Sequence, residues 1–224
     1  MGYYIDIEKI TIDEYREKLE SGYLPPSRMI LKDKLDERFE YFKSIGIRNV
    51  KGLIQLLKKK DKFIELSAID CLSKEYLTVL LRELKSILPK PNKIDDFNVI
   101  SKVSVKKLEK VGIKNTEKLF DRVITKTDRQ KLADSIGVNY SDILELTKLS
   151  DLSRIKWVGV TYAQMLYNLG VDTVEKVSKS DPKDLHARIN QMIKEHNIFK
   201  GAIGLNDVQI LVETANELSL EIEY

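Results

Sequence analysis

The residues best suited to chemistry lie in a short glycine-containing stretch that follows a predicted helix. Arg154 and Lys156 supply positive charge, and Gly159 comes shortly after them. We expect a tight turn from Lys156 to Val160, with Thr161 as the N-cap of the next helix. The first N–H groups of a helix have no intrahelical partner, and a nearby glycine lets a ligand approach them closely. The chemistry predicted for this stretch is therefore the binding of a phosphate group.

This stretch resembles the hairpins of the helix-hairpin-helix superfamily, which carry two glycines separated by an apolar residue and followed by an alanine. Val158, Gly159 and Ala163 match that pattern, whereas Trp157 occupies the first glycine position. The indole would either block a phosphate or anchor the turn in the core. The resemblance implies that the amides from Val158 to Thr161 contact the DNA backbone. A helix-packing turn without a ligand is the alternative.

The sequence carries little that indicates an enzyme. His186 and His196 are ten residues apart, and this spacing does not place two metal ligands on one helical face. Cys71 lies in an apolar-rich segment and is expected to be a core thiol. Glycine-rich phosphate loops, nucleophile elbows and dinucleotide fingerprints are missing. We therefore predict no catalytic residue, metal or cofactor, with Lys156 as a Schiff-base lyase residue the remote alternative.

The composition is that of a soluble, helix-rich protein. The 224 residues are 42% hydrophobic and 33% charged, with ten glycines and five prolines. Apolar runs are too short to span a membrane, and the N-terminal residues are not those of a signal peptide. One cysteine and the missing export signal predict a cytoplasmic protein without disulfides.

Positive charge is unevenly distributed, although the net charge is only +3. Lys43 to Lys62 holds seven basic residues and one acid, and Lys102 to Lys131 holds ten basic residues and four acids. Gly204 to Tyr224 holds five acids and no base. Such segregation predicts a basic face and an acidic end, with ordinary solvated helix faces as the alternative. At the start of the second basic segment, a partial hairpin is predicted at Ser101, Lys102, Lys106 and Lys107.

The chain repeats itself. FEYFKSIGIRNVKGLIQLL, from Phe39, aligns with VKKLEKVGIKNTEKLFDRV, from Val105, and YNLGVDTVEKV, from Tyr167, begins a third copy. In each copy a helix ends on a glycine, and Asn or Thr caps the next one. Each unit has an apolar face too small to fold alone, so neighbouring units must stack. The fold predicted is all-α, with three related units of short helices and an N-terminal arm.

We divide the chain at its proline-containing segments. The N-terminal residues read as a short extended segment, a helix capped by Thr11 or Asp13, and an extended connector at YLPPSRMIL. The predicted parts are residues 1–34, the helix and arm; 35–90, the first repeat; 91–155, the second; and 156–224, the third. The best internal boundary is Leu88 to Phe97, which contains two prolines.

The chain also resembles, over essentially its whole length, a bacterial family known as domain of unknown function 4332, which is classed with helix-hairpin-helix proteins. The residues that carry the resemblance are DLSRIKWVG, GIKNTEKLF, LGVDTVEKV and FKGAIGLND. It implies a tandem helix-hairpin-helix fold and, by association, DNA binding.

The function predicted is non-enzymatic binding of a DNA or RNA backbone without sequence preference. The alternative is a protein-interaction scaffold that docks a partner through Trp157 or the acidic C-terminal helix. No membrane partner is expected.

Overall fold

The computed structural model describes residues 2–224, and the prediction of an all-α fold is confirmed: these residues form helices and no strand. Short connections join most helices, so each lies near its neighbours in sequence. The helices are α1 (Ile12–Ser21), η1 (Pro26–Lys32), α2 (Leu35–Ser44), α3 (Val50–Lys58), α4 (Lys60–Ser67), α5 (Lys74–Ser86), η2 (Ile94–Asp96), α6 (Lys102–Lys110), α7 (Thr116–Phe120), α8 (Lys126–Ile136), α9 (Tyr140–Leu152), α10 (Val160–Asn168), α11 (Val174–Ser178), α12 (Pro182–His196) and α13 (Leu205–Asn216).

The chain divides into two units, each with its own hydrophobic core. The small unit is Asp6–Leu88. The large unit is Pro89–Tyr224 together with the described residues up to Ile5. The chain passes between the units twice, after Ile5 and after Leu88, and the second crossing is at the start of the proline-containing segment. The division into four parts remains a prediction.

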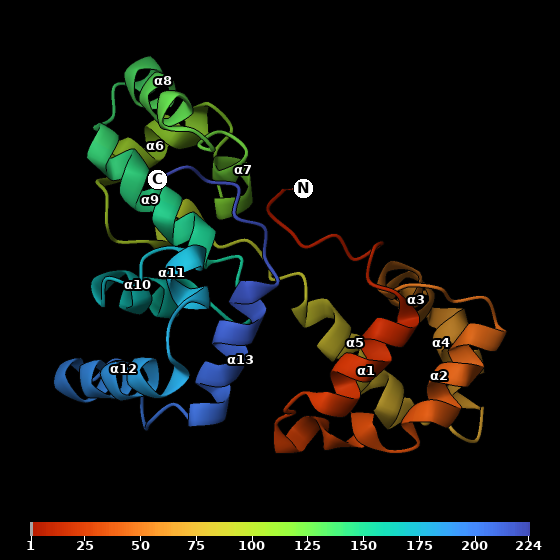
Figure 1. Ribbon diagram of the computed structural model, residues 1–224. Coiled ribbons are helices and arrows are strands. Elements are labelled where there is room, and N and C mark those ends of the chain that lie inside the picture. Colours follow the sequence, from red (N-terminus) through yellow and green to blue (C-terminus); the bar gives the residue numbers. More distant parts are fainter. Residues whose placement is uncertain (1) are drawn as a thin grey trace. The chain divides into compact units, whose positions relative to one another are not determined.

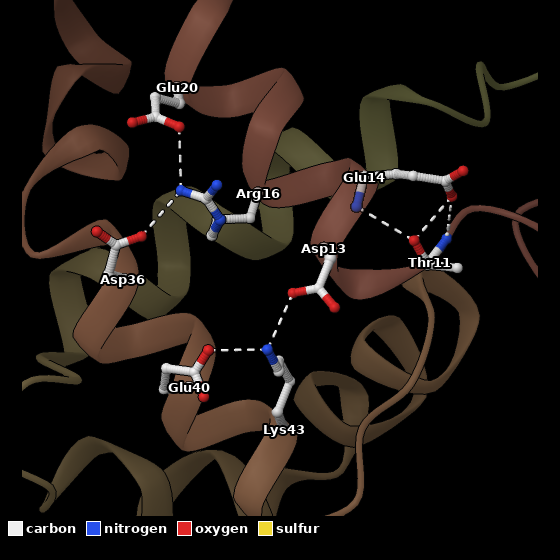
Figure 2. Close-up of polar contacts among 8 residues, drawn as sticks. All are labelled: Thr11, Asp13, Glu14, Arg16, Glu20, Asp36, Glu40 and Lys43. Atoms are coloured by element: carbon white, nitrogen blue, oxygen red, sulfur yellow. Dashed lines mark hydrogen bonds and ion pairs between the residues drawn. The ribbon is translucent and has the colours of Figure 1, made fainter.

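In the small unit, α1 begins with a complete capping box. The Thr11 hydroxyl accepts the N–H of Glu14, and the Glu14 carboxylate accepts the N–H of Thr11 at 2.7 Å. Arg16 of α1 donates to Asp36 of α2 at 2.8 Å, and Lys43 of α2 donates to Asp13 of α1 at 3.1 Å (Figure 2). These exposed pairs join the outer faces of two helices whose inner faces form the core. Thr11 is thus the cap, as predicted.

Two expectations for the N-terminal residues are wrong. The connector at YLPPSRMIL is not extended, because Pro26–Lys32 forms the 3-10 helix η1. Proline is compatible with the first helical position, where its missing N–H would have no partner and its fixed φ suits a helix. Residues 3–7 likewise form no strand; the backbone bridge in this region joins Thr11 to Asn49.

The large unit is built around α9, which packs against α7, α8 and α10. The last helix, α13, packs on α11 and α12, so the acidic C-terminal helix buries one face, including Val208 and Leu211. After α13 the chain runs back as an extended tail toward the end of α7 (Figure 1). There the N–H of Glu223 donates to the carbonyl of Ile124 at 2.9 Å.

The three segments predicted to correspond share one local geometry. Gly46, Gly112 and Gly170 each follow a helix with φ between 76° and 85°, a region that favours glycine. The next helices are capped by the side chains of Asn49, Asn115 and Thr173. The glycine stop and the side-chain cap are therefore present at all three places. The repetition of whole units remains a prediction.

Candidate nucleic-acid interface

A tight turn joins α9 to α10. The N–H of Val158 donates to the carbonyl of Ile155 at 3.1 Å, which closes the turn. Trp157 lies inside this turn with φ +67°, in the left-handed region. Residues other than glycine are uncommon there because the Cβ atom meets the backbone. The turn thus has a shape that favours glycine at the position where the superfamily pattern has its first glycine.

The helix after the turn begins without a side-chain cap. The N-cap is Gly159, not Thr161 as predicted, because the helical hydrogen bonds already start with the N–H of Ala163 and the carbonyl of Gly159. A glycine has no side chain to accept the first-turn N–H groups of Val160, Thr161 and Tyr162. Gly159 and Thr161 are exposed, so this helix start faces solvent.

The position that a side chain would take at Gly159 is empty. Its φ of −86° and ψ of −177° are extended backbone, so glycine is not needed here for conformation. A Cβ atom at this position would meet no atom within 4 Å. The Trp157 indole therefore does not fill the corner, and 39% of its surface is exposed. The expectation that the indole anchors the turn in the core is wrong, and the expectation that it blocks a phosphate remains a prediction. The amine of Lys156 lies 4.5 Å from the centre of the indole ring.

Arg154 does not belong to the exposed turn. Only 2% of its surface is exposed, and its guanidinium pairs with the carboxylate of Asp151 at 2.7 Å. It also donates to the carbonyls of Tyr3 at 3.1 Å and Ser219 at 2.9 Å. The prediction that Arg154 supplies charge to a phosphate is wrong, because all three guanidinium nitrogens donate hydrogen bonds to groups inside the protein. Its neighbours Leu152 and Ile155 are apolar and buried, but the burial of Arg154 itself depends on the distant Tyr3 and Ser219.

The buried Arg154–Asp151 pair connects segments that are far apart in the sequence. Asp151 accepts the N–H of Val174 at 3.1 Å and the hydroxyl of Tyr224 at 2.9 Å. The Tyr3 hydroxyl is hydrogen-bonded to Thr116 at 2.8 Å, and burial raises the pKa of the Tyr3 phenol. The first residues and the tail are thus tied to the base of the turn. Sequence reasoning missed these contacts because most of them join residues that are far apart along the chain, such as Tyr3 with Arg154 and Asp151 with Tyr224.

Val158 also lies inside. It is 4% exposed, and its N–H is already used in closing the turn. Of the residues predicted for the hairpin, Lys156, Gly159, Val160 and Thr161 remain on or near the surface. The candidate interface is therefore the surface corner made by Lys156, Trp157 and residues 159–162, which we call the α10 corner.

The partial hairpin predicted at α6 is largely occupied. The Ser101 hydroxyl accepts the N–H of Ser104 at 3.0 Å, so the cap uses one of the amides expected to be free. Lys102 pairs with Asp95 at 2.6 Å, and Lys107 donates to the carbonyl of Gly137 at 2.6 Å. These contacts argue against three of the four residues as open phosphate ligands. Lys106 is exposed.

The two predicted hairpins are not brought together. Lys107 contacts Gly137, just before α9, whereas the α10 corner follows the end of α9. A helix of 13 residues is about 20 Å long, so the two sites lie at opposite ends of α9. The basic side chains of Lys102 to Lys131 are also divided, because most lie on the surface and one lies in the core. The buried one, Arg129, is 1% exposed and donates to the carbonyl of Glu223.

The other candidates for chemistry have structural partners. His186 is hydrogen-bonded to the carbonyl of Ile203 at 3.0 Å, and Cys71 is a buried thiol. In residues 2–224, no three His, Cys, Asp or Glu side chains gather in a way that could hold a metal ion. None of the described helices has both the length and the apolar character needed to cross a membrane.

Comparison with known proteins identifies a family but no characterised relative. No curated protein and no solved structure matches the chain. The family described as "Domain of unknown function (DUF4332)" matches residues 98–218, which is less than the full length expected from the sequence. The match begins shortly before α6 and ends just after α13. Because it covers more than half of the chain, we conclude that this protein belongs to the DUF4332 family.

Proposed function

We propose that the large unit binds the phosphate backbone of a nucleic acid, without sequence preference and without catalysing a reaction. The observation that carries the proposal is the uncapped start of α10 with open space above Gly159. The N-terminus of a helix holds a partial positive charge, and its first N–H groups point outward. A phosphate oxygen is the acceptor that fits such a corner.

Three features of the α10 corner support phosphate over a smaller or neutral ligand. The first-turn N–H groups of Val160, Thr161 and Tyr162 offer several donors in one direction. The hydroxyl of Thr161 lies on an exposed residue, and Lys156 adds a full positive charge beside the turn. Because all of these groups address backbone oxygens, they carry no information about base sequence.

The exposed indole supports a second function. Trp157 is held on the surface by a backbone conformation that costs free energy for any residue with a Cβ atom. Tryptophan is among the residues that most often dominate protein interfaces. The alternative proposal is therefore a protein-interaction scaffold in which Trp157 is the anchor and the α10 corner has no ligand. It predicts a co-purifying protein that is lost on Trp157→Ala.

The direct test is fluorescence anisotropy with labelled duplex and single-stranded oligonucleotides. We expect micromolar or tighter binding at low salt, a steep loss of affinity as salt rises, and similar affinities for unrelated sequences. Gly159→Glu should weaken binding because the new carboxylate repels phosphate at the corner. Ala187→Glu adds the same charge at an exposed position of α12 and should leave most of the binding intact.

Two results would change the proposal. Absence of binding at low salt would favour the scaffold, as would equal losses for the two glutamate variants. Nicking or base release in the same DNA samples would show an enzyme.

A further inference from the structure

The small unit carries a shallow groove between α4 and α5. Its volume is about 390 Å³, and it is lined by Phe63, Thr78, Leu81, Arg82 and Lys85. Phe63 and Leu81 are partly buried and pack against the core of the small unit. Their outer surfaces form an apolar floor that is open to solvent.

Two basic side chains, Arg82 and Lys85, line this floor on the α5 side. Thr78, Leu81, Arg82 and Lys85 follow the spacing of one face of α5, and Lys74 extends the same face by one turn. The acidic residue nearest to this face is Glu75, in the first turn of α5, and it does not line the groove. Arg82 and Lys85 are both exposed. The charged residues that line the groove are therefore both basic, and its floor is apolar.

The second wall has the same character. Phe63 lies on α4, and Lys59 and Lys60 precede it by four and three residues, so they flank it along the helix. The nearby Lys62 already pairs with Glu65 at 2.6 Å. The basic segment Lys43 to Lys62 thus ends one residue before the apolar side chain that α4 contributes to the groove.

We propose that this groove binds an acidic amphipathic helix of a partner protein. One large apolar side chain of the partner lies between Phe63 and Leu81, and acidic residues one turn away pair with Arg82 and Lys85. This is the helix-in-groove mode of recognition, in which apolar anchors give contact area and charges give orientation. A nucleic-acid backbone fits less well, because phosphates and sugars offer no side chain for an apolar floor.

The proposal is tested by selecting a displayed library of random peptides on the full chain at low salt. We expect the enriched peptides to be acidic and to share one leucine, phenylalanine or tryptophan between acidic residues. An enriched peptide, synthesised with a fluorescent label, should lose at least about tenfold in affinity for Arg82→Glu/Lys85→Glu, a loss of about 1.4 kcal/mol.

The matched control is Lys9→Glu/Arg48→Glu, which reverses two exposed charges of the small unit outside the groove lining. It should bind the peptide as the unmodified chain does. A peptide in which lysines replace the acids should bind the Arg82→Glu/Lys85→Glu chain and not the unmodified one, a rescue that a misfolded protein would not show. Far-UV circular dichroism checks that both variants are helical.

Several outcomes would overturn the proposal. They are enrichment of basic or neutral peptides, no enrichment, or retention of affinity by the groove variant. Loss of duplex DNA binding in the groove variant, with peptide binding unchanged, would assign the groove to nucleic acid instead. The peptide results do not bear on the α10 corner, because its test uses oligonucleotides and variants of the large unit.

Discussion

One substitution at the α10 corner should raise stability and weaken nucleic-acid binding at the same time. Gly159 has backbone angles that any residue can adopt, and there is room for a side chain. An aspartate there can accept the N–H of Thr161 or Tyr162 and so complete the missing cap. A variant that lost binding because it misfolds would also be less stable. Measuring stability and affinity together therefore distinguishes misfolding from loss of a phosphate contact.

The size of each effect follows from the local geometry of Gly159→Asp. An aspartate cap is better than glycine by a few tenths of a kcal/mol, and a carboxylate at a helix N-terminus adds about 0.3–1 kcal/mol. We expect a total gain of about 0.5–1 kcal/mol, or about 1–4 °C in Tm for a chain of this length. Loss of one hydrogen bond to a phosphate, about 1.5–3 kcal/mol, should weaken binding roughly tenfold to a hundredfold.

The assay pairs thermal unfolding, followed by circular dichroism, with anisotropy titration of a labelled duplex. Ala187→Glu is again the control for added charge. A stabilised Gly159→Asp chain with unchanged affinity would show that these amides do not contact the nucleic acid. A lower Tm would show that the first-turn N–H groups of α10 cannot accept a side-chain cap at Gly159.

Three further predictions concern the large unit. Trp157→Gly should raise the free energy of unfolding by about 1 kcal/mol in denaturant titration, because glycine removes the cost of the left-handed conformation; a loss would show that the indole stabilises the turn. Arg154→Met should destabilise by about 3–5 kcal/mol, because Asp151 keeps a buried charge without its partner; a loss below 1 kcal/mol would contradict this. Burial alone would raise the pKa of Asp172, but hydrogen bonds from two lysines hold it below its ordinary value. The ionised Asp172 therefore stabilises the fold at neutral pH, and this stabilisation is lost as pH falls through the lowered pKa. Asp172→Asn should reduce the free energy of unfolding at neutral pH and make it depend less on pH in the acid range. Unfolding titrations at several pH values measure both effects, and an unchanged pH profile would refute the prediction.

The helical class and several helix ends could be predicted because they depend on neighbouring residues. Thr11 and Glu14 form their capping box within one turn, and the glycine stops at Gly46, Gly112 and Gly170 need only the local chain. The η1 helix was missed because two prolines were taken to exclude helix, although proline is acceptable at its first position.

The position of the α10 corner in the chain was predicted, but not which of its residues reach the surface. Gly159 and Lys156 could be identified from spacing alone. Arg154 could not be assigned correctly, because its burial depends on Tyr3 and Ser219, which are distant in sequence. A lysine- and arginine-rich segment indicates charge, but packing decides which side chains reach solvent and which satisfy carbonyls inside the protein.

The amino-acid sequence by itself determined the all-α class, the glycine stops and the location of the turn between α9 and α10. These features follow from hydrogen bonds and torsion angles within a few residues. Only the tertiary structure decided that Arg154 and Arg129 belong to the core, that Trp157 lies on the surface, and that α4 and α5 enclose a basic groove. The reason is physical: the exposure of a side chain depends on every segment that packs against it, and most of those segments are far away along the chain.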